Sequence, residues 1–411
     1  QDMGELFAAG DWAAVFRWSP YTEWYLNSMS LEGSPTAEHH AATYGDRPYS
    51  SFVEEFRDRS LGAEVAGWAG LFAAAGALYV VPVTKHHDGF LMWQSAISNP
   101  HRQGWMASRD HIAELEAAVR QHGMRFGLYY SGGLDWTFNP PPIDGLAAMF
   151  ANIPTSPEYC EYATAQMREL IDRFHPGVLW NDIGWPKPLD PNEMFEYFYD
   201  RVPDGVVNDR FDMLRAGQGL VHSDIRTPEY STTAPSSGKW EVCRGIGRSF
   251  GYNRMERGDT LPSADELVWL LADIVGRGGN LLLNVGPTAD GQIPLAQAMR
   301  LTAVGWWLRV NGAAIYGTRP WTPPIVATTG ATDDGREVRF TTDGTTVYAI
   351  IRGAPHSEVR LPGVRPGEGA EVRMLGNSRV LAHSVRGDQL VVDLPDHLPD
   401  APATVLAIGG C

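Results

Sequence analysis

Between residues 64 and 311 the sequence alternates repeatedly between segments with helical periodicity and short apolar runs. The segments with helical periodicity predict helices over residues 64–75, 111–122, 157–174, 193–202, 264–277 and 296–310. The apolar runs predict strands over residues 78–83, 125–130, 177–182, 206–210 and 280–285, with two shorter strands near 224–230 and 239–242. Strands that are apolar throughout and separated by helices form parallel sheets covered on both faces. Because the unit recurs so often, the sequence predicts a (β/α)8 TIM-like barrel.

The sequence pattern changes after Trp321, where helical periodicity stops. Short alternating segments separated by Gly, Pro or Asp then occupy residues 337–341, 346–351, 358–361, 370–374, 390–394 and 404–408. This pattern is typical of an antiparallel β-sandwich. The chain is therefore expected to hold a catalytic barrel over residues 1–320 and a C-terminal β-sandwich domain over residues 321–411, with the boundary in the Pro-bearing stretch Arg319–Pro324.

The count of barrel strands is one short. From Leu78 onward at most seven are visible, and residues 1–62 contain no convincing eighth, since Phe7–Trp18 is predicted helical and Glu23–Ser28 the start of a loop. A barrel without one strand exposes an unpaired edge. We therefore expect the first strand to lie upstream of Gln1.

Composition excludes several kinds of partner. Lys and Arg number 33 and Asp and Glu number 49, which gives a formal net charge of −16. Such a surface repels nucleic acid and anionic membranes. Three widely spaced cysteines (Cys160, Cys243 and Cys411) form neither a disulfide framework nor a Cys-based zinc site. The first twelve residues show no signal-peptide pattern, which is compatible with the cytoplasm, while the compartment and the oligomeric state stay open.

Polar residues follow five successive strands of the predicted barrel: His86-His87-Asp88, Tyr129-Tyr130-Ser131, Trp180-Asn181-Asp182, Asn208-Asp209-Arg210 and Glu229. In a barrel of this type the carboxyl ends of the strands form the catalytic mouth. His86 and His87 are adjacent and are expected to point to opposite sides, so no metal site and no cofactor are predicted. Two carboxylates without a nucleophilic Ser or Cys favour glycoside hydrolysis.

Several motifs keep a common order along the chain: KHHDGFLMWQS (85–95), RFGLYYSGGLDW (125–136), LWND (179–182), VVNDR (206–210), TPEY (227–230), WEVCRGIGRSFGYN (240–253), GGNLLLNVGPTADG (278–291) and NGAAIYGTRPW (311–321). On these motifs the chain resembles the retaining α-L-fucosidases of glycoside hydrolase family 29. The resemblance implies an exo-acting hydrolase of terminal α-L-fucosyl residues on fucosylated oligosaccharides or glycoconjugates.

The resemblance also implies roles for particular residues. Asp182 matches the nucleophile and Glu229 resembles the acid/base, with Glu241 as the alternative acid/base. Arg210 matches the arginine that orients the catalytic centre. The residues implied to bind the sugar hydroxyls are His86, His87, Tyr129, Glu23 and Trp24, and those implied to pack near the C6 methyl are Trp180 and Phe250.

One part of the family pattern is absent. Family members carry a strand of the type F-x-x-H-W-G before the EW pair, whereas Phe16-Arg17-Trp18 has neither the His nor the Gly. This absence coincides with the missing strand. Two other functions stay open at this point: a non-catalytic fucose-binding protein on the same scaffold, and a retaining hydrolase of a related sugar such as galactose. The preferred linkage also stays open.

Overall fold

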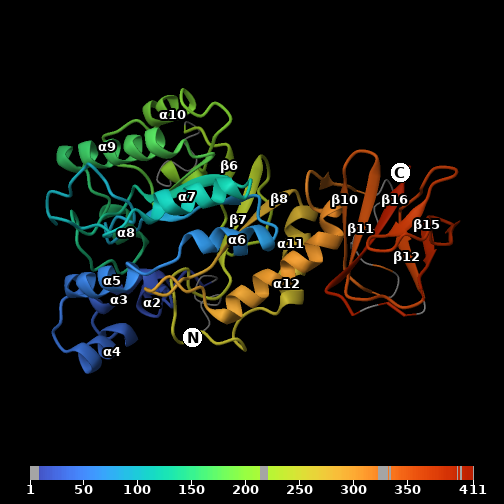
Figure 1. Cartoon of the computed structure of the whole chain (residues 1–411), viewed down its shortest axis with the longest axis horizontal. Coiled ribbons are helices and arrows are strands. Elements are labelled where there is room, and N and C mark those ends of the chain that lie inside the picture. Colours follow the sequence, from blue (N-terminus) through green and yellow to red (C-terminus); the bar gives the residue numbers. More distant parts are fainter. Residues whose placement is uncertain are drawn as a thin grey trace.

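The computed structural model describes residues 9–212, 221–322, 332, 335–395, 397–398 and 400–410. It shows a barrel domain followed by a C-terminal β-sandwich, with two helices, α11 (Ala264–Gly276) and α12 (Leu295–Asn311), between them (Figure 1). The predicted fold class is confirmed. None of the described helices is both long and apolar enough to cross a bilayer.

The barrel strands are parallel and follow the predicted order. They are β1 (Tyr79–Val80), β2 (Val83–Lys85), β3 (Arg125–Ser131), β4 (Val178–Asp182), β5 (Val206–Val207), β6 (Ile225–Arg226), β7 (Lys239–Gly245) and β8 (Gly279–Asn284). Two sheets carry them: β1 and β2 both pair with β3, which continues to β4 and β5, and β6 pairs with β7, which continues to β8. A single bridge between Asn208 and Ile225 joins the two sheets. The seven predicted strand positions therefore form one connected series from β1 to β8, which curves into a ring that, among the described residues, is open between these two strands.

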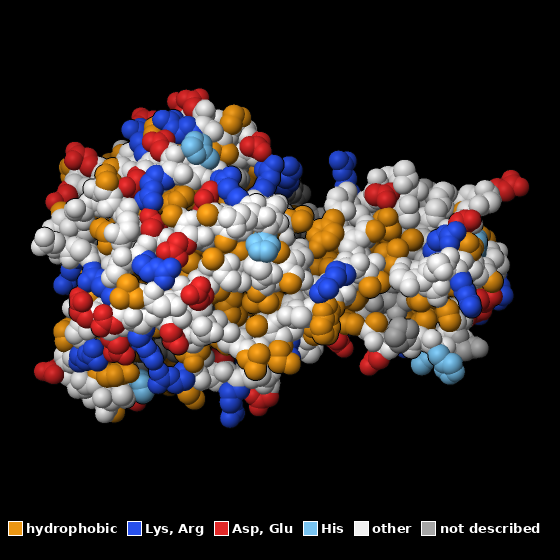
Figure 2. All heavy atoms as spheres, viewed as in Figure 1, with side chains coloured by type: hydrophobic (Ala, Val, Ile, Leu, Met, Phe, Trp, Pro, Cys, Tyr) orange, Lys and Arg blue, Asp and Glu red, His pale blue; other side chains and the backbone are white. Residues whose placement is uncertain are grey.

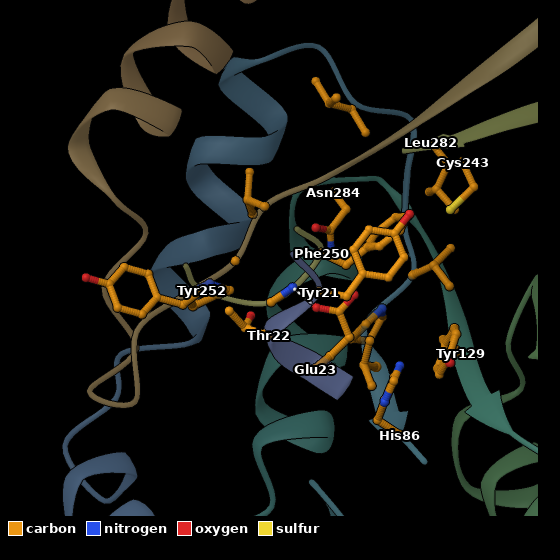
Figure 3. A pocket seen from close by; sticks show the side chains of 18 of the residues that line it. Tyr21, Thr22, Glu23, His86, Tyr129, Cys243, Phe250, Tyr252, Leu282 and Asn284 are labelled. Carbon is orange, nitrogen blue, oxygen red and sulfur yellow. Dashed lines mark hydrogen bonds between the residues drawn. The ribbon is translucent and has the colours of Figure 1, made fainter. Parts of the chain in front are cut away.

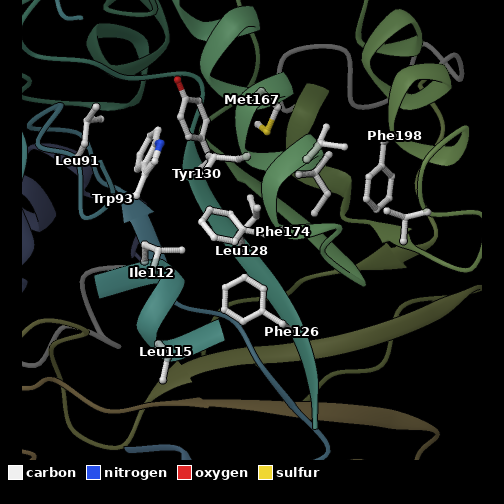
Figure 4. Close-up of a cluster of buried hydrophobic side chains, with 14 of the residues drawn as sticks. Leu91, Trp93, Ile112, Leu115, Phe126, Leu128, Tyr130, Met167, Phe174 and Phe198 are labelled. Atoms are coloured by element: carbon white, nitrogen blue, oxygen red, sulfur yellow. The ribbon is translucent and has the colours of Figure 1, made fainter. Parts of the chain in front are cut away.

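Helices cover the outside of this ring, and their apolar side chains pack against its apolar strands. They are α6 (Ala66–Ala74), α7 (His111–Gln121), α8 (Leu146–Ala151), α9 (Pro157–Phe174), α10 (Pro191–Tyr199), α11 and α12. Asp110, Ser156 and Ser263 cap the N-termini of α7, α9 and α11, and Ser263 forms a capping box with Glu266. Figure 4 shows the resulting core, in which side chains of β3, α7 and α9 meet.

The ring is incomplete at one place. Among the described residues, β1 pairs only with β3 and β8 only with β7. The helices outside this gap are nevertheless in contact, since a Cβ added to Gly305 of α12 would lie 1.9 Å from the Ala74 carbonyl oxygen of α6. Leu78 and Val83 at the edge of the gap are 61% and 39% exposed. No described strand fills the first position, and the expectation that it lies upstream of Gln1 stays a prediction.

The segment before the first described strand is helical. It contains α2 (Trp12–Arg17), η1 (Thr22–Trp24), α3 (Tyr25–Met29), α4 (Pro35–Tyr44), η2 (Tyr49–Ser51) and α5 (Phe52–Ser60). The expectation that Glu23–Ser28 starts a loop is wrong. Tertiary contacts explain the helices, because the buried Asn27 amide both donates to the Ile143 carbonyl oxygen and accepts from the Ile143 N–H. The predicted helix over 7–18 corresponds to α2, and residues 7 and 8 lie outside the described residues.

The C-terminal domain consists of two antiparallel sheets. One has the order β13 (Val372–Met374), β16 (Ala403–Gly409), β11 (Thr346–Arg352), β10 (Val338–Thr342) and β9 (Arg319–Pro320), and the other has the order β12 (Glu358–Pro362), β15 (Gln389–Asp393) and β14 (His383–Arg386). The two sheets enclose a core of alternating apolar residues. The Trp307 indole of α12 donates to the Ala403 carbonyl oxygen at 2.9 Å and so fastens this domain to the barrel.

The face that carries α12 is rich in apolar side chains (Figure 2). Leu295, Met299, Trp306 and Val310 of this helix are all at least half exposed. They lie on the side of α12 opposite the buried Leu301, Val304 and Leu308.

Candidate active site

Ten of the eleven residues singled out in the sequence line a single cavity at the carboxyl ends of the barrel strands. They are Glu23, Trp24, His86, His87, Tyr129, Trp180, Asp182, Arg210, Glu229 and Phe250. Figure 3 shows side chains from the N-terminal segment, from the ends of β2 and β3 and from the segment after β7 around this common space. The cavity measures about 2340 Å³, above the roughly 300–1,000 Å³ of ordinary ligand pockets, because it continues between β8 and β1.

Asp182 is the last residue of β4 and is 7% exposed. Its Oδ2 accepts the Tyr129 hydroxyl at 2.8 Å, and its Oδ1 accepts Arg210 Nη1 and the Ile183 N–H, each at 3.0 Å. Ile183 has a φ of 60°, a left-handed conformation that costs a β-branched residue about 1–3 kcal/mol. The chain therefore turns sharply after β4 in a way that aims a backbone donor at the carboxylate.

Glu229 follows β6, and its side chain is 34% exposed. Its Oε1 accepts the Tyr21 hydroxyl at 2.8 Å, and its Oε2 lies 3.4 Å from both Nη1 and Nη2 of Arg210. Arg210 Nη1 therefore contacts Asp182 and Glu229 at the same time. Tyr21 was not predicted as a site residue, and the signal that could have found it is its position two residues before Glu23 in YTEWY.

Arg210 lies in η3 (Asp209–Asp212), directly after β5, and is fixed from below by Thr227. Its Nε donates to the Thr227 hydroxyl at 3.1 Å, and its Nη2 donates to the Thr227 carbonyl oxygen at 3.0 Å. Asp209 in turn accepts the N–H and the hydroxyl of Thr227. This chain of hydrogen bonds holds the guanidinium between the two carboxylates.

His86 and His87 do not point to opposite sides, and that expectation is wrong. Their ring centroids lie 3.9 Å apart because the chain turns here, with the Gly89 N–H donating to the His86 carbonyl oxygen. His87 shares a hydrogen bond of 2.7 Å with the Ser131 hydroxyl, and His86 stacks on Tyr129 with centroids 5.7 Å apart. Burial lowers the pKa of His86 to about 4, so its ring is neutral at physiological pH and offers one donor and one acceptor.

The EW pair is tied to the segment after β7. Glu23 accepts the Gly251 N–H at 2.9 Å and the Ser249 hydroxyl at 3.2 Å. Burial raises the pKa of Glu23 to about 7. Trp24 packs edge-on against His87, with centroids 5.0 Å apart.

Phe250 belongs to the same segment and sits between two tyrosines. Its ring contacts Tyr21 and Tyr230 edge-on, each with a centroid distance of 5.6 Å. It also packs in the apolar cluster that contains Trp180. These two rings form an apolar side of the cavity beside the carboxylates.

Glu241 differs from the other ten residues. It lies on β7, is 2% exposed and does not line the cavity. Its Oε2 accepts the hydroxyl of Tyr79. The residue weighed as the alternative acid/base thus lies beneath the site. Within the described ranges, no group of three His, Cys, Asp or Glu side chains is placed to hold a metal ion.

Comparisons with known proteins show the family of the chain. A family model described as Alpha-L-fucosidase matches residues 9–313. The tissue alpha-L-fucosidase of Bos taurus is 34% identical over 380 residues, which cover 88% of this chain and 76% of that protein. The alpha-L-fucosidase of Branchiostoma floridae is 34% identical over 372 residues, which cover 84% of this chain and 77% of that protein.

Solved structures show the same likeness. The crystal structure of Thermotoga maritima alpha-fucosidase in complex with fucose has a TM-score of 0.85 and 40% sequence identity to this chain. The match covers 96% of this chain and 90% of that one. From the family model, the curated relatives and the shared fold, the chain belongs to the α-L-fucosidase family, glycoside hydrolase family 29.

Proposed function

We propose that this chain is a retaining, exo-acting α-L-fucosidase in which Asp182 is the nucleophile and Glu229 the acid/base. The observation that carries the proposal is Arg210 Nη1, which lies 3.0 Å from Asp182 and 3.4 Å from Glu229. Two carboxylate oxygens that share one nitrogen at these distances lie closer together than the about 6.5–9.5 Å between the carboxyl groups of inverting glycosidases. The arrangement favours the retaining geometry, whose separation is about 5–5.5 Å.

In the first step an Asp182 oxygen attacks the anomeric carbon of the fucosyl residue and forms an ester bond. The bond from that carbon to the leaving oxygen breaks, and Glu229 gives its proton to the leaving oxygen. Asp182 suits the role because a hydroxyl, a guanidinium and a backbone N–H all donate to it and hold both of its carboxyl oxygens in place.

In the second step water attacks the same carbon, Glu229 takes a proton from that water, and Asp182 leaves. Glu229 must therefore alternate between an acid and a base. Its neighbour Tyr21 suits both states, because a phenol can donate to a carboxylate and accept from a carboxylic acid. Burial raises the pKa of Tyr21, so its hydroxyl keeps its proton throughout.

The remaining cavity residues match the two faces of a 6-deoxy sugar. Neutral His86, Tyr129 and Glu23 supply donors and acceptors for secondary hydroxyls, while Trp180 and Phe250 supply an apolar wall for the methyl group. Glu229 is favoured over Glu241 as the acid/base because Glu229 lines the cavity and Glu241 does not.

The test is turnover of a chromogenic aryl α-L-fucoside, with the first-formed anomer read by NMR. We expect α-L-fucose as the first product and slower turnover of the matching α-L-galactoside, since an added hydroxyl at C6 meets the apolar wall. Absence of turnover by well-folded protein would favour the fucose-binding alternative. β-L-Fucose as the first product would overturn the retaining mechanism.

A further inference from the structure

A buried carboxyl group lies directly behind the cavity wall, on a strand that contributes neither candidate catalytic carboxylate. Glu241 of β7 accepts the Tyr79 hydroxyl through Oε2, while its Oε1 is buried and has no partner at hydrogen-bond geometry. The buried Trp180 Nε1 likewise has no partner at that geometry. Tyr79, whose hydroxyl Glu241 accepts, packs in the apolar cluster that contains Trp180. The unpartnered indole N–H and the unpartnered carboxyl oxygen therefore lie in the same buried region behind the cavity wall.

The Trp180 ring supports both side-chain donors of Asp182. Tyr129 stacks on it with centroids 5.4 Å apart and an interplanar angle of 23°. The Arg210 guanidinium lies 4.6 Å from the ring centroid. Tyr129 and Arg210 are the side chains whose hydrogen bonds fix the two oxygens of Asp182. A displacement of the indole would therefore displace both donors at once.

We propose that Glu241 is a positioning residue: its carboxyl group holds the indole N–H of Trp180 and thereby fixes the ring on which the two donors of Asp182 rest. This role rests on the proposed function of Asp182. Glu241 would contact no substrate atom, because it does not line the cavity.

The charge state of Glu241 supports this role. Burial raises its pKa to about 7, while the hydrogen bond from Tyr79 and the positive charge of Arg210 oppose that rise. Cys243 of the same strand is near enough for the charge of Glu241 to raise the pKa of its thiol. An ionised carboxylate can accept from both the phenol and the indole, whereas the neutral acid carries an O–H that needs an acceptor of its own. The proposed interaction between the Glu241 carboxyl group and the Trp180 indole N–H is therefore strongest when Glu241 is ionised.

The kinetic test is Glu241→Gln. An amide has only one acceptor oxygen for the two donors, so the indole or the phenol loses its partner. We expect kcat on an aryl α-L-fucoside to fall about 10–100-fold, as a misplacement of reacting groups by a fraction of an ångström produces, with KM changed less than about threefold. An unchanged kcat, or a loss confined to KM, would overturn the role.

The chain contains a matched control for this variant. Glu169 of α9 accepts the Trp93 indole N–H at 2.9 Å, and neither residue lines the cavity. Glu169→Gln breaks the same kind of pair away from the site, and we expect it to leave kcat and KM unchanged. An equal loss of kcat in both variants would mean that the loss arises from folding and not from the position of Glu241 behind the site.

A second measurement does not depend on turnover. The near-ultraviolet circular dichroism of the wild type is expected to change with a midpoint near pH 7, and Glu241→Gln is expected to remove part of that change while Glu169→Gln keeps it. Identical titrations in the wild type and Glu241→Gln would overturn the proposal. Absence of fucoside turnover in the wild type would instead count against the proposed function, and the spectra would still decide whether Glu241 holds Trp180.

Discussion

The two sides of the strand ring differ in how completely their backbones are paired. On one side β3 and β4 each have neighbours on both edges, and all five residues of β4 are buried. On the other side β8 has a described neighbour on one edge only, and Asn280 is exposed while its next four residues are half-buried. The side with full pairing carries the nucleophile candidate, and the other side borders the enlarged part of the cavity.

This difference shows where the barrel can fix a reacting group. Asp182 ends a strand held by two neighbours and receives three hydrogen bonds. Glu229 follows the two-residue strand β6, where a single backbone bridge joins it to Cys243 of β7, and its carboxyl group contacts Tyr21 and Arg210. A nucleophile must stay in one place through both steps, while an acid/base must exchange a proton with solvent. Accordingly, the side chain of Asp182 is 10% exposed and that of Glu229 is 34% exposed.

The largest expected effect is on the fully paired side. Asp182→Asn keeps the shape of the side chain but removes the nucleophilic charge, so we expect kcat/KM on an aryl α-L-fucoside to fall about 10⁴-fold or more. The control is Asp204→Asn, which removes an exposed carboxylate paired with Arg125 far from the cavity and should leave turnover unchanged. Retention of more than a few per cent of wild-type activity by Asp182→Asn would contradict its role.

On the other side, Glu229→Ala is expected to lower kcat/KM about 10³-fold for substrates with poor leaving groups. The loss should be much smaller for an aryl fucoside whose leaving group needs no proton, and azide should restore turnover by replacing the water of the second step. If azide restored turnover in Glu241→Ala and not in Glu229→Ala, Glu241 would be the acid/base instead of Glu229.

The sequence predicted much of this arrangement because the carboxyl ends of parallel strands meet at one mouth. Tyr129, Asp182 and Arg210 could be placed together on that rule alone. The hydrogen bond from Tyr21 to Glu229 could not be predicted, since it joins residues 208 positions apart through the docking of a helical segment. The turn that brings the rings of His86 and His87 together was missed for a similar reason, because it ends the extended backbone that the alternation rule assumes.

The fold was predictable to the same extent. Strands β3, β4 and β8 have apolar runs long enough to show in the sequence, whereas β14 of the sandwich is mostly exposed and was not predicted. Trp180 and Glu241 illustrate the limit within the site. Their strands were predicted, but the sequence does not show where each side chain ends. In the structure Trp180 lines the cavity, whereas Glu241 lies behind it.

Whether the edges of β8 and β1 that lack a described neighbour are open to solvent can be measured. We predict that these edges of β8 and β1 are covered in solution, because an apolar edge such as Leu281–Leu283 is otherwise a template for aggregation. Hydrogen–deuterium exchange by mass spectrometry should then show the amides of residues 279–284 slowed about 10²-fold or more relative to those of the exposed stretch 252–260. Exchange at equal rates, with β3 and β4 protected, would show an open edge.

The smallest expected effect concerns stability on the fully paired side. Lys85 ends β2 directly before His86, and its ammonium group forms a fully buried ion pair of 2.9 Å with Asp135. Lys85→Met leaves the Asp135 charge buried without its cation, so we expect the free energy of unfolding in urea to fall by about 3 kcal/mol.

The control is the exposed pair of Arg125 and Asp204, whose charged groups are also 2.9 Å apart. Arg125→Met should lower the free energy of unfolding by less than about 1 kcal/mol, because water already screens both charges. Adding Asp135→Asn to Lys85→Met should recover part of the loss, since the uncompensated charge is then gone. Equal costs for Lys85→Met and Arg125→Met would mean that burial adds nothing to this pair, and the fully paired side would owe its rigidity to backbone pairing and apolar packing alone.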